Sequence, residues 1–351
     1  MPTTATQESV PPGRKARPPR RMRTLLIILL VFFVLVGGAG WWAVYHYGPM
    51  FGIYPTTPSP ARYADIALGY LERGYYAEGP EWEAAKKRVK DAAAGAESYA
   101  DVHEALKEAT PVAGGKHSFF LTPEESTQTA TEEAARYVPP EVSTEGGITT
   151  VVIPELGTAV KDQLANYAAV AAKGITDAAP TTCGWIIDVR KNRGGNMYPM
   201  LSGLSPLIPD GPLMAVRTRQ GDDTVVMMNS DGAAVESGKA LIPVPEYPKL
   251  LGQPIAILQD EGTASSGEAV VTAFRGMKTA RTFGTPTAGY TSGNSIYNLY
   301  DEAVIVLTGG MYVDRAGVSL DELPIAPDES VTSGQAPKAA AEWLAQQGCS
   351  R

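Results

Sequence analysis

The sequence predicts an α/β domain, with helices packed on a mainly parallel sheet, preceded by a small helical lobe and one membrane-spanning helix. Three observations lead to this prediction. From residue 147 onward, short apolar runs of strand length alternate with longer segments of helical periodicity. Amphipathic helical patterns fill residues 61–115. An uncharged run covers residues 24–45, which is long enough to cross a bilayer as a helix.

The N-terminal segment predicts how the chain is oriented at a membrane. Residues 1–23 are rich in Pro, Thr and Arg, which is typical of a disordered tail. Basic residues that precede the run at 24–45 predict a cytoplasmic N-terminus and a folded part outside the cell. A cleaved signal peptide is the alternative, but the length of the run and the absence of an A-x-A site favour an uncleaved anchor. We therefore expect a single-pass protein of the cell membrane.

Charge and cysteine content restrict the partners and the cofactors. The net charge is -8, and residues 1–23 carry six basic residues against one acidic residue, so the remainder carries -8 - 5 = -13. An acidic folded part argues against a nucleic-acid partner and suits a cationic substrate. No cysteine or histidine spacing resembles a metal site, and we expect neither a metal nor an organic cofactor. Cys183 and Cys349 could pair in an oxidising compartment or remain as two thiols, and spacing does not decide between these.

The elements follow in order along the chain. Residues 46–60 read as a linker, and helices are expected at 60–76, 80–95 and 98–109 within the lobe at 61–115. The main domain is expected over 116–351, starting with a short strand at 118–121. Its further strands are predicted at 147–153, 185–189, 254–258 and 303–307, and its helices at 160–176, 196–207 and 265–275.

Ser265 is the first candidate for catalysis, because it stands between a buried strand and the start of a helix. A serine at such a turn has a fixed direction, and the free N–H groups of the helix can stabilise an oxyanion. The alternative is structural, with Ser265 and Glu268 forming a capping box.

Two further segments carry candidate residues. Gly194 and Gly195 also follow a buried strand, where they either bring backbone N–H groups to developing negative charge or form an ordinary turn. His117 lies beside two phenylalanines and could act as the base that a serine nucleophile needs, although a lone histidine is often structural. Of the other two histidines, His46 lies at the membrane boundary, and His103 lies among Glu and Lys on a predicted helix, which favours exposure to solvent.

Together the segments D-x-R-x-N-x-G-G (188–195), T-A-S-S-G-E (263–268), G-T-P-T-A-G (284–289) and I-A-P-D (325–328) resemble the carboxy-terminal processing (tail-specific) peptidases of family S41. The resemblance covers about 147–330. It implies a crotonase/ClpP-like core with Ser265 as nucleophile. It also implies an oxyanion hole formed by Gly194 or Gly195 together with Ser266.

The sequence departs from the best-known branch of that family at two points. Tyr290 stands where that branch has its catalytic lysine, and the chain between His117 and the next strand is too short for a PDZ module. His117 instead matches a branch that uses an upstream histidine, and the whole resembles the PDZ-less, nisin-resistance-like branch. In that branch a late carboxylate can orient the histidine. Asp321, Glu322 and Ser118 are candidates for a supporting role here, as is Glu268.

The expected function is therefore that of an extracellular serine peptidase that cuts peptides or proteins near their C-terminus. The resemblance adds a cationic lantibiotic of the nisin type as one candidate substrate. His117 would take the proton of Ser265, and an acyl-enzyme would follow. A non-catalytic protein of the same fold that sequesters a peptide or ligand at the cell surface is the contrasting hypothesis. The sequence leaves the natural substrate and the oligomeric state open.

Overall fold

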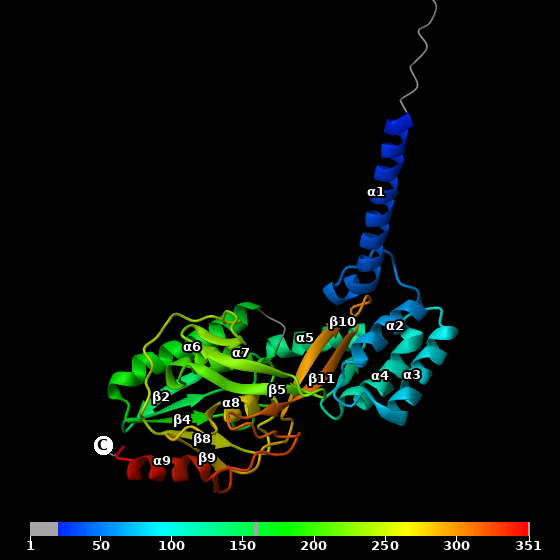
Figure 1. The fold of residues 1–351 in the computed structure, drawn as a ribbon. Coiled ribbons are helices and arrows are strands. Elements are labelled where there is room, and N and C mark those ends of the chain that lie inside the picture. The colour runs from blue at the N-terminus through cyan, green and yellow to red at the C-terminus, as the bar shows by residue number, and fades with distance from the viewer. Residues whose placement is uncertain (1–19, 158–160, 350–351) are drawn as a thin grey trace, which may run out of the picture. The chain divides into compact units, whose positions relative to one another are not determined.

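The computed structural model describes residues 20–157 and 161–349. The chain divides into two compact units, with the boundary in the sequence between Thr57 and Pro58. The first unit contains helix α1 (Arg20–Tyr47) and the 3₁₀ turn η1 (Gly48–Phe51) (Figure 1). The predicted tail at 1–23 lies almost entirely outside the described residues.

A helix covers the run at 24–45, as predicted. The structure does not support the prediction that this helix spans a membrane. Within the part of the chain that the structure describes, no helix has the length and apolar character needed to cross a membrane. The side chains at 24–27 and at 30 belong to the predicted span and lie outside the described residues.

The second unit begins with the helical lobe, formed by α2 (Pro60–Leu71), α3 (Gly79–Ala94) and α4 (Ala100–Gly114). Helix α2 starts at Pro60 because the Ser59 side chain accepts a hydrogen bond from the N–H of Arg62 at 3.3 Å. The inward faces of the three helices form one apolar cluster that also contains side chains of strands β1 (Phe119–Leu121) and β11 (Val304–Val313). The three helices predicted for this segment are confirmed.

The prediction for His103 on α4 is wrong, because this side chain is largely shielded from solvent. Its Nε2 lies 2.8 Å from Oδ2 of Asp301, and both side chains are close to one-eighth exposed. The hydroxyl of Tyr63 donates a hydrogen bond to the other carboxylate oxygen of Asp301 at 3.0 Å. This polar cluster joins the lobe to the turn that precedes β11.

A six-stranded sheet forms the centre of the main domain, in the order β12-β9-β8-β4-β3-β2. All neighbouring strands are parallel except β2 and β3, which confirms the predicted mainly parallel α/β sheet. The strands are β2 (Glu141–Glu145), β3 (Ile148–Val152), β4 (Gly184–Asp188), β8 (Ile255–Gln259), β9 (Ala280–Gly284) and β12 (Glu329–Ser330).

Helices cover both faces of this sheet, as Figure 1 shows. Alternate side chains of β4 point to opposite faces: Trp185 and Ile187 enter one apolar cluster and Ile186 enters another. The cluster of Trp185 packs on α6 (Lys161–Ala178), α7 (Met197–Gly203) and α8 (Ser266–Phe274), while that of Ile186 packs on α9 (Ala336–Gln346). Short 3₁₀ turns follow α6 and α7, as η2 (Ala179–Thr181) and η3 (Ser205–Leu207).

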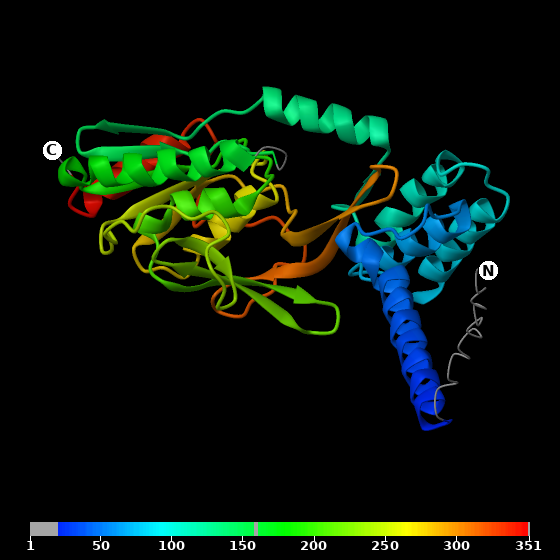
Figure 2. The same ribbon diagram turned by 90° about the horizontal axis from the view of Figure 1, so that it is seen from above.

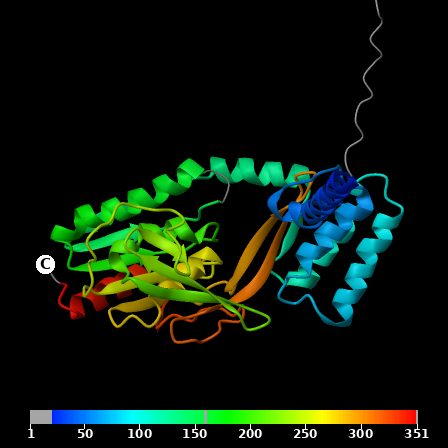
Figure 3. The ribbon, with the colours of Figure 1, turned by 45° about the horizontal axis from the view of Figure 1, so that its top comes forward.

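A second, antiparallel sheet was not predicted. Its order is β1-β11-β5-β6-β7, and β10 pairs with the other edge of β11. Strand β11 belongs to both parts of the unit, because Ile305 and Leu307 lie in the cluster of the lobe and Tyr312 lies in that of the main domain. Figures 2 and 3 show the β10–β11 hairpin extending to the helical lobe, with α5 (Pro123–Ala135) running alongside. The remaining strands are β5 (Gly211–Thr218), β6 (Asp223–Asn229), β7 (Gly232–Val235) and β10 (Ser292–Asn298).

The two cysteines are joined as a disulfide, which settles the alternatives left open by the sequence. Cys183 and Cys349 have their Cα atoms 5.1 Å apart and are 166 positions apart in the chain. The bond attaches the segment that follows α9 to the residue that precedes β4.

Candidate active site

Ser265 occupies the turn between β8 and α8 and has an unusual backbone. Its φ of 51° lies in the left-handed region, which is costly for a residue with a side chain. The N–H of Ser265 donates a hydrogen bond to Oε2 of Glu268 at 2.9 Å. The carboxylate of Glu268 therefore stabilises the turn that presents the serine.

Glu268 is fully buried and connects this turn to a second segment. Its Oε2 also accepts a hydrogen bond from the N–H of Tyr290 at 2.7 Å. Its Oε1 accepts from the hydroxyl of Thr287 at 2.5 Å and from the N–H of Gly289 at 2.8 Å. Burial raises the pKa of Glu268, and these hydrogen bonds act in the opposite direction. A carboxylate with four donors fixes the segment 287–290 against the start of α8.

The glycine pair lies against Ser265. A Cβ atom placed on Gly194 would be 2.8 Å from the Cβ of Ser265, and its φ is 110°, so only glycine fits this position. The N–H of Gly194 already donates to Oδ1 of Asn192 at 2.9 Å. The N–H groups of Gly195 and Ser266 have no acceptor among the described residues. The hydroxyl of Ser266 donates to the carbonyl of Gly195 at 2.7 Å and holds these two segments together.

His117 is hydrogen-bonded to a carboxylate through one hydroxyl. Its Nδ1 lies 2.9 Å from Oγ of Ser292, and that hydroxyl donates to Oε1 of Glu322 at 2.8 Å. An ionised carboxylate can only accept, so the Ser292 hydroxyl gives its proton to Glu322 and accepts from Nδ1–H of His117. This leaves Nε2 of the imidazole unprotonated, with a lone pair available to accept a proton.

The surroundings of His117 keep the ring neutral. Burial lowers the pKa of His117 from 6.5 to about 4, and the charge of the adjacent Lys116 adds to this effect. The Nζ of Lys116 donates to the backbone carbonyl of Glu322 at 2.9 Å and lies 5.0 Å from the centre of the Tyr290 ring. The rings of His117 and Tyr290 meet edge to face, with centroids 5.1 Å apart.

These contacts connect the histidine and the serine indirectly, through Tyr290 and Glu268. Tyr290 touches His117 with its ring, and its N–H shares Oε2 of Glu268 with the N–H of Ser265. No hydrogen bond joins His117 directly to Ser265 within residues 20–157 and 161–349. The site contains these predicted residues: His117, Gly194, Gly195, Ser265, Ser266, Glu268 and Glu322.

Of the remaining candidates, two lie outside this network. Asp321 is exposed and accepts a hydrogen bond from the hydroxyl of Ser319, whereas Glu322 is buried. The hydroxyl of Ser118 accepts from the N–H of Thr308 at 2.8 Å, and no hydrogen bond joins it to the imidazole among the described residues.

Ser292 was not predicted, because its segment has no distinctive motif and its only signal is its position three residues after the G-T-P-T-A-G segment. Among the described residues, no group of His, Cys, Asp and Glu is arranged to bind a metal ion.

The sequence profile described as "Peptidase family S41" matches residues 147–331, which contain the nucleophile candidate and the glycine pair. The chain belongs to peptidase family S41. A nisin-resistance protein from Lactococcus lactis subsp. lactis is 32% identical over 305 residues, which is 87% of this S41 chain and 93% of the relative. The match therefore includes the helical lobe and also His117, which follows it in the chain.

Other proteins resemble the chain in part of the sequence or in fold. A chloroplastic C-terminal processing peptidase from Tetradesmus obliquus is 24% identical over 165 residues, which is 46% of this chain but only 32% of that relative. The solved structure of a lipoprotein from Streptococcus agalactiae superposes with a TM-score of 0.74 at 29% identity, over 84% of this chain and 99% of that one. An S41 chain takes a peptide or a protein as its substrate by family membership.

Proposed function

We propose that this S41 chain is a serine peptidase of the cell surface in which Ser265 is the nucleophile and His117 is the general base. One observation carries the proposal. The hydrogen bonds from His117 through Ser292 to Glu322 leave Nε2 as the basic nitrogen of a neutral ring. A neutral imidazole with a defined tautomer is what a serine nucleophile needs near neutral pH.

The reaction proceeds in two steps. Nε2 of His117 takes the proton of the Ser265 hydroxyl as the oxygen attacks the scissile carbonyl, and then gives this proton to the leaving amine. Water, activated by the same nitrogen, hydrolyses the acyl-enzyme. The imidazolium that forms during each step is stabilised by Glu322 through the hydroxyl of Ser292. The proposal requires Nε2 of His117 and the Ser265 hydroxyl to come within hydrogen-bond distance in the complex with the peptide.

The oxyanion is held by two N–H groups in this proposal. Those of Gly195 and Ser266 have no acceptor within the described part of the chain, and Ser266 stands at the N-terminus of α8, where the helix favours negative charge. The N–H of Gly194 is satisfied by Asn192, so we assign Gly194 the role of close packing against Ser265 instead.

The substrate is proposed to be a peptide cut near its C-terminus. Two relatives support this: one is named a C-terminal processing peptidase and the other a nisin-resistance protein. Nisin is cationic, and the chain after residue 23 carries a charge of -13, from -8 - 5, which favours attraction of a basic peptide. Hydrolysis of a lantibiotic of this type is therefore the specific activity that we propose.

A location outside the cytoplasm is supported by the disulfide between Cys183 and Cys349, which persists in oxidising compartments. The basic tail and the uncharged run at 24–45 support attachment to the membrane with the peptidase on the outer side. Fractionation of cells that express the full chain, with protease treatment of intact cells, tests this part of the proposal. Recovery of the chain in the soluble cytoplasmic fraction would contradict it.

The catalytic proposal is tested with a serine-directed fluorophosphonate probe and with mass spectrometry of cationic lanthionine peptides. The wild type should be labelled at Ser265 and should release a C-terminal fragment, while Ser265→Ala and His117→Ala should do neither. Folded wild-type protein that binds the peptide but is neither labelled nor able to cut it would establish a non-catalytic binding protein instead.

A further inference from the structure

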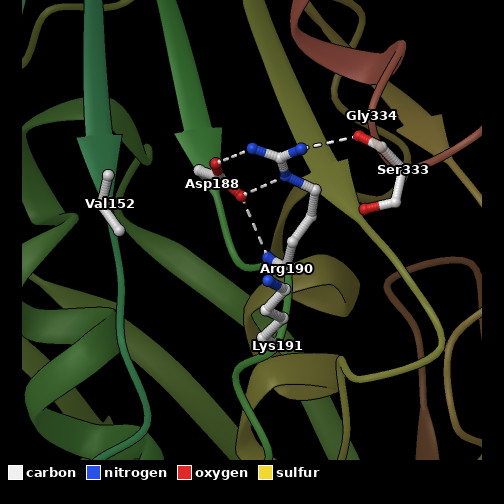
Figure 4. A pocket seen from close by; sticks show the side chains of 6 residues that line it. All are labelled: Val152, Asp188, Arg190, Lys191, Ser333 and Gly334. Atoms are coloured by element: carbon white, nitrogen blue, oxygen red, sulfur yellow. Dashed lines mark hydrogen bonds and ion pairs between the residues drawn. The ribbon is translucent and has the colours of Figure 1, made fainter.

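The turn after β4, which leads into the glycine pair, is held by charged groups of the main domain. Arg190 donates from Nε and one terminal nitrogen to the two carboxylate oxygens of Asp188, at 2.9 and 2.6 Å, and from its other terminal nitrogen to the carbonyl of Ser333 at 2.6 Å (Figure 4). The N–H of Lys191 donates to Oδ1 of Asp260 at 2.9 Å. The backbone on the nucleophile side of the site therefore has a fixed position.

His117, the proposed base, stands on a less regular piece of backbone. It lies in the short connection between α4 and β1, where the N–H of Ser118 donates to the carbonyl of Gly115 at 3.0 Å and closes a turn. His117 thus belongs neither to the helix before it nor to the strand after it. The place of its imidazole depends on contacts that this turn receives from other elements.

Strand β10 supplies two such contacts. Ser292 and Asn294 are two positions apart on this strand, so their side chains point to the same face. The Ser292 hydroxyl holds the imidazole at Nδ1, and the side-chain NH₂ group of Asn294 donates to the backbone carbonyl of His117 at 3.0 Å. The base is therefore held from one strand at two points, its ring and its backbone.

A buried threonine sets the direction of the Asn294 amide. The hydroxyl of Thr308 on β11 donates to Oδ1 of Asn294 at 2.8 Å, and the His117 carbonyl can only accept, so the NH₂ group of Asn294 must face the histidine. Thr308 is fully buried, and its own carbonyl accepts from the N–H of Tyr75 in the helical lobe at 2.9 Å. The amide of Asn294 is thus fixed at both of its ends.

The pairing of β10 with β11 is irregular at the same place. Gly293 pairs with Gly310, but Asn294 pairs with Thr308, so Gly309 is left over as a bulge. Bulges redirect nearby side chains and are frequent next to active sites. This one falls between the strand positions of the two side chains that hold the base.

From these contacts we infer that Asn294 is a positioning residue for the general base, because its amide fixes the backbone of His117 and thereby the direction of Nε2. The inference rests on the proposed peptidase function and adds a residue outside the relay to the carboxylate. Ser292 determines which ring nitrogen carries the proton, and Asn294 determines where the ring stands. Without Asn294 the turn can shift, and the imidazole then leaves its partner on β10.

The first measurement is kinetic and uses the full chain with nisin as the cationic lanthionine peptide. Asn294→Ala should lower kcat about tenfold, the effect of one lost hydrogen bond on the position of the base, and should leave KM unchanged. Asn294→Asp keeps the shape and the acceptor for Thr308 but cannot donate to the carbonyl, so its kcat should fall at least as far. Asn298→Ala, an exposed position on the same face of β10, is the matched control and should behave as the wild type.

The second measurement does not depend on turnover. The chain has three histidines, so labelling them with ¹⁵N gives few ring signals, and His117→Ala identifies those of His117. The wild type should show a single tautomer with the proton on Nδ1. In Asn294→Ala the two ring signals should move towards each other as the second tautomer becomes populated, and in Asn298→Ala they should stay in place. A merely structural tether would lower the melting temperature of Asn294→Ala and leave the ring signals and kcat unchanged.

The outcomes separate this inference from the proposed function. Unchanged kcat in both Asn294 variants, an increase in KM alone, or ring signals that match those of the wild type would overturn the inference. If Asn294→Ala does not fold, as thermal unfolding shows, Asn294→Asp carries both measurements. A wild type that cuts nisin and tolerates both variants keeps its function without this residue. A wild type that cuts no nisin, but whose His117 signals respond to Asn294→Ala and not to Asn298→Ala, keeps the positioning contact without the peptidase.

Discussion

The imidazole of His117 donates from Nδ1 to the hydroxyl of Ser292 at 2.9 Å, although the two residues lie 175 positions apart in the chain. Ser292 opens β10, so the orientation of the histidine depends on the hairpin formed by β10 and β11. The same hydroxyl donates to Glu322, which makes it the connection between the histidine and its carboxylate.

Replacing Ser292 by Ala should lower kcat by roughly 100-fold, because the imidazole loses the partner that sets its tautomer and orientation. KM should change little, since Ser292 faces the histidine. Glu322→Gln should have a smaller effect, because an amide oxygen can still accept from Ser292 while the charge is lost. Ser118→Ala is the matched control, a buried serine next to His117 that bonds Thr308 instead. Equal rates for Ser292→Ala and Ser118→Ala would contradict the assignment.

The pH dependence of kcat/KM should follow the titration of His117. The base must be neutral, and burial together with the charge of Lys116 lowers its pKa from 6.5 to about 4. Activity should therefore persist through mildly acidic pH and fall as the pH drops through about 4. Lys116→Met removes one of the two causes, so the midpoint should move to a higher pH, between 4 and 6.5. Lys239→Met should leave the profile unchanged, and an unshifted midpoint in Lys116→Met would refute this account.

Glu268→Gln should lower the free energy of unfolding by about 2–4 kcal/mol. The side-chain amide keeps one oxygen acceptor, and its NH₂ group replaces the other oxygen, so this NH₂ group would face two of the four hydrogen-bond donors. The donors that lose their acceptor belong either to Ser265 and Tyr290 or to Thr287 and Gly289. Urea unfolding measures the change. Glu261→Gln in the same turn is the control, since this side chain is exposed and accepts a hydrogen bond from the hydroxyl of Thr285; its effect should stay within about 0.5 kcal/mol. A comparable loss in both variants would argue against a special role for Glu268.

Reduction of the bond between Cys183 and Cys349 should lower stability by about 3–5 kcal/mol, because it releases a closed loop with a sequence separation of 166. Thermal unfolding with and without reductant measures this loss. The double variant Cys183→Ser, Cys349→Ser should unfold at the temperature of the reduced wild type and should not respond to reductant. An identical melting temperature for oxidised and reduced wild type would show that the bond contributes nothing.

The sequence predicts best where a residue carries a local signal. The parallel strands are short apolar runs bounded by turn residues, and their pattern gives the central sheet directly. Ser265 and Gly194 stand directly after such strands, within motifs shared by a family. The antiparallel strands β5 to β7 have a less regular sequence pattern. Buried and exposed side chains do not alternate strictly along them, and the pairing of β5 with β6 shifts in register between Pro212 and Met214.

Residues whose environment comes from distant segments could not be predicted in this way. His103 has charged neighbours on its own helix, and its burial depends on Asp301, 198 positions later. Ser292 is an ordinary serine until the hairpin places it beside the histidine. Glu322 and Asp321 are adjacent, and only the fold shows that Glu322 is buried and faces Ser292.

Strand β11 passes through both apolar clusters, with Ile305 in the one beneath the lobe and Tyr312 in the one beneath α8. His117 precedes β1, which pairs with the lobe end of this strand, whereas Ser292 pairs with Met311 near the other end. The nucleophile precedes α8, which packs in the second cluster. The position of the proposed base relative to the nucleophile therefore depends on the geometry of β11 along its whole length, so a substitution in this strand that touches neither residue can still change the rate.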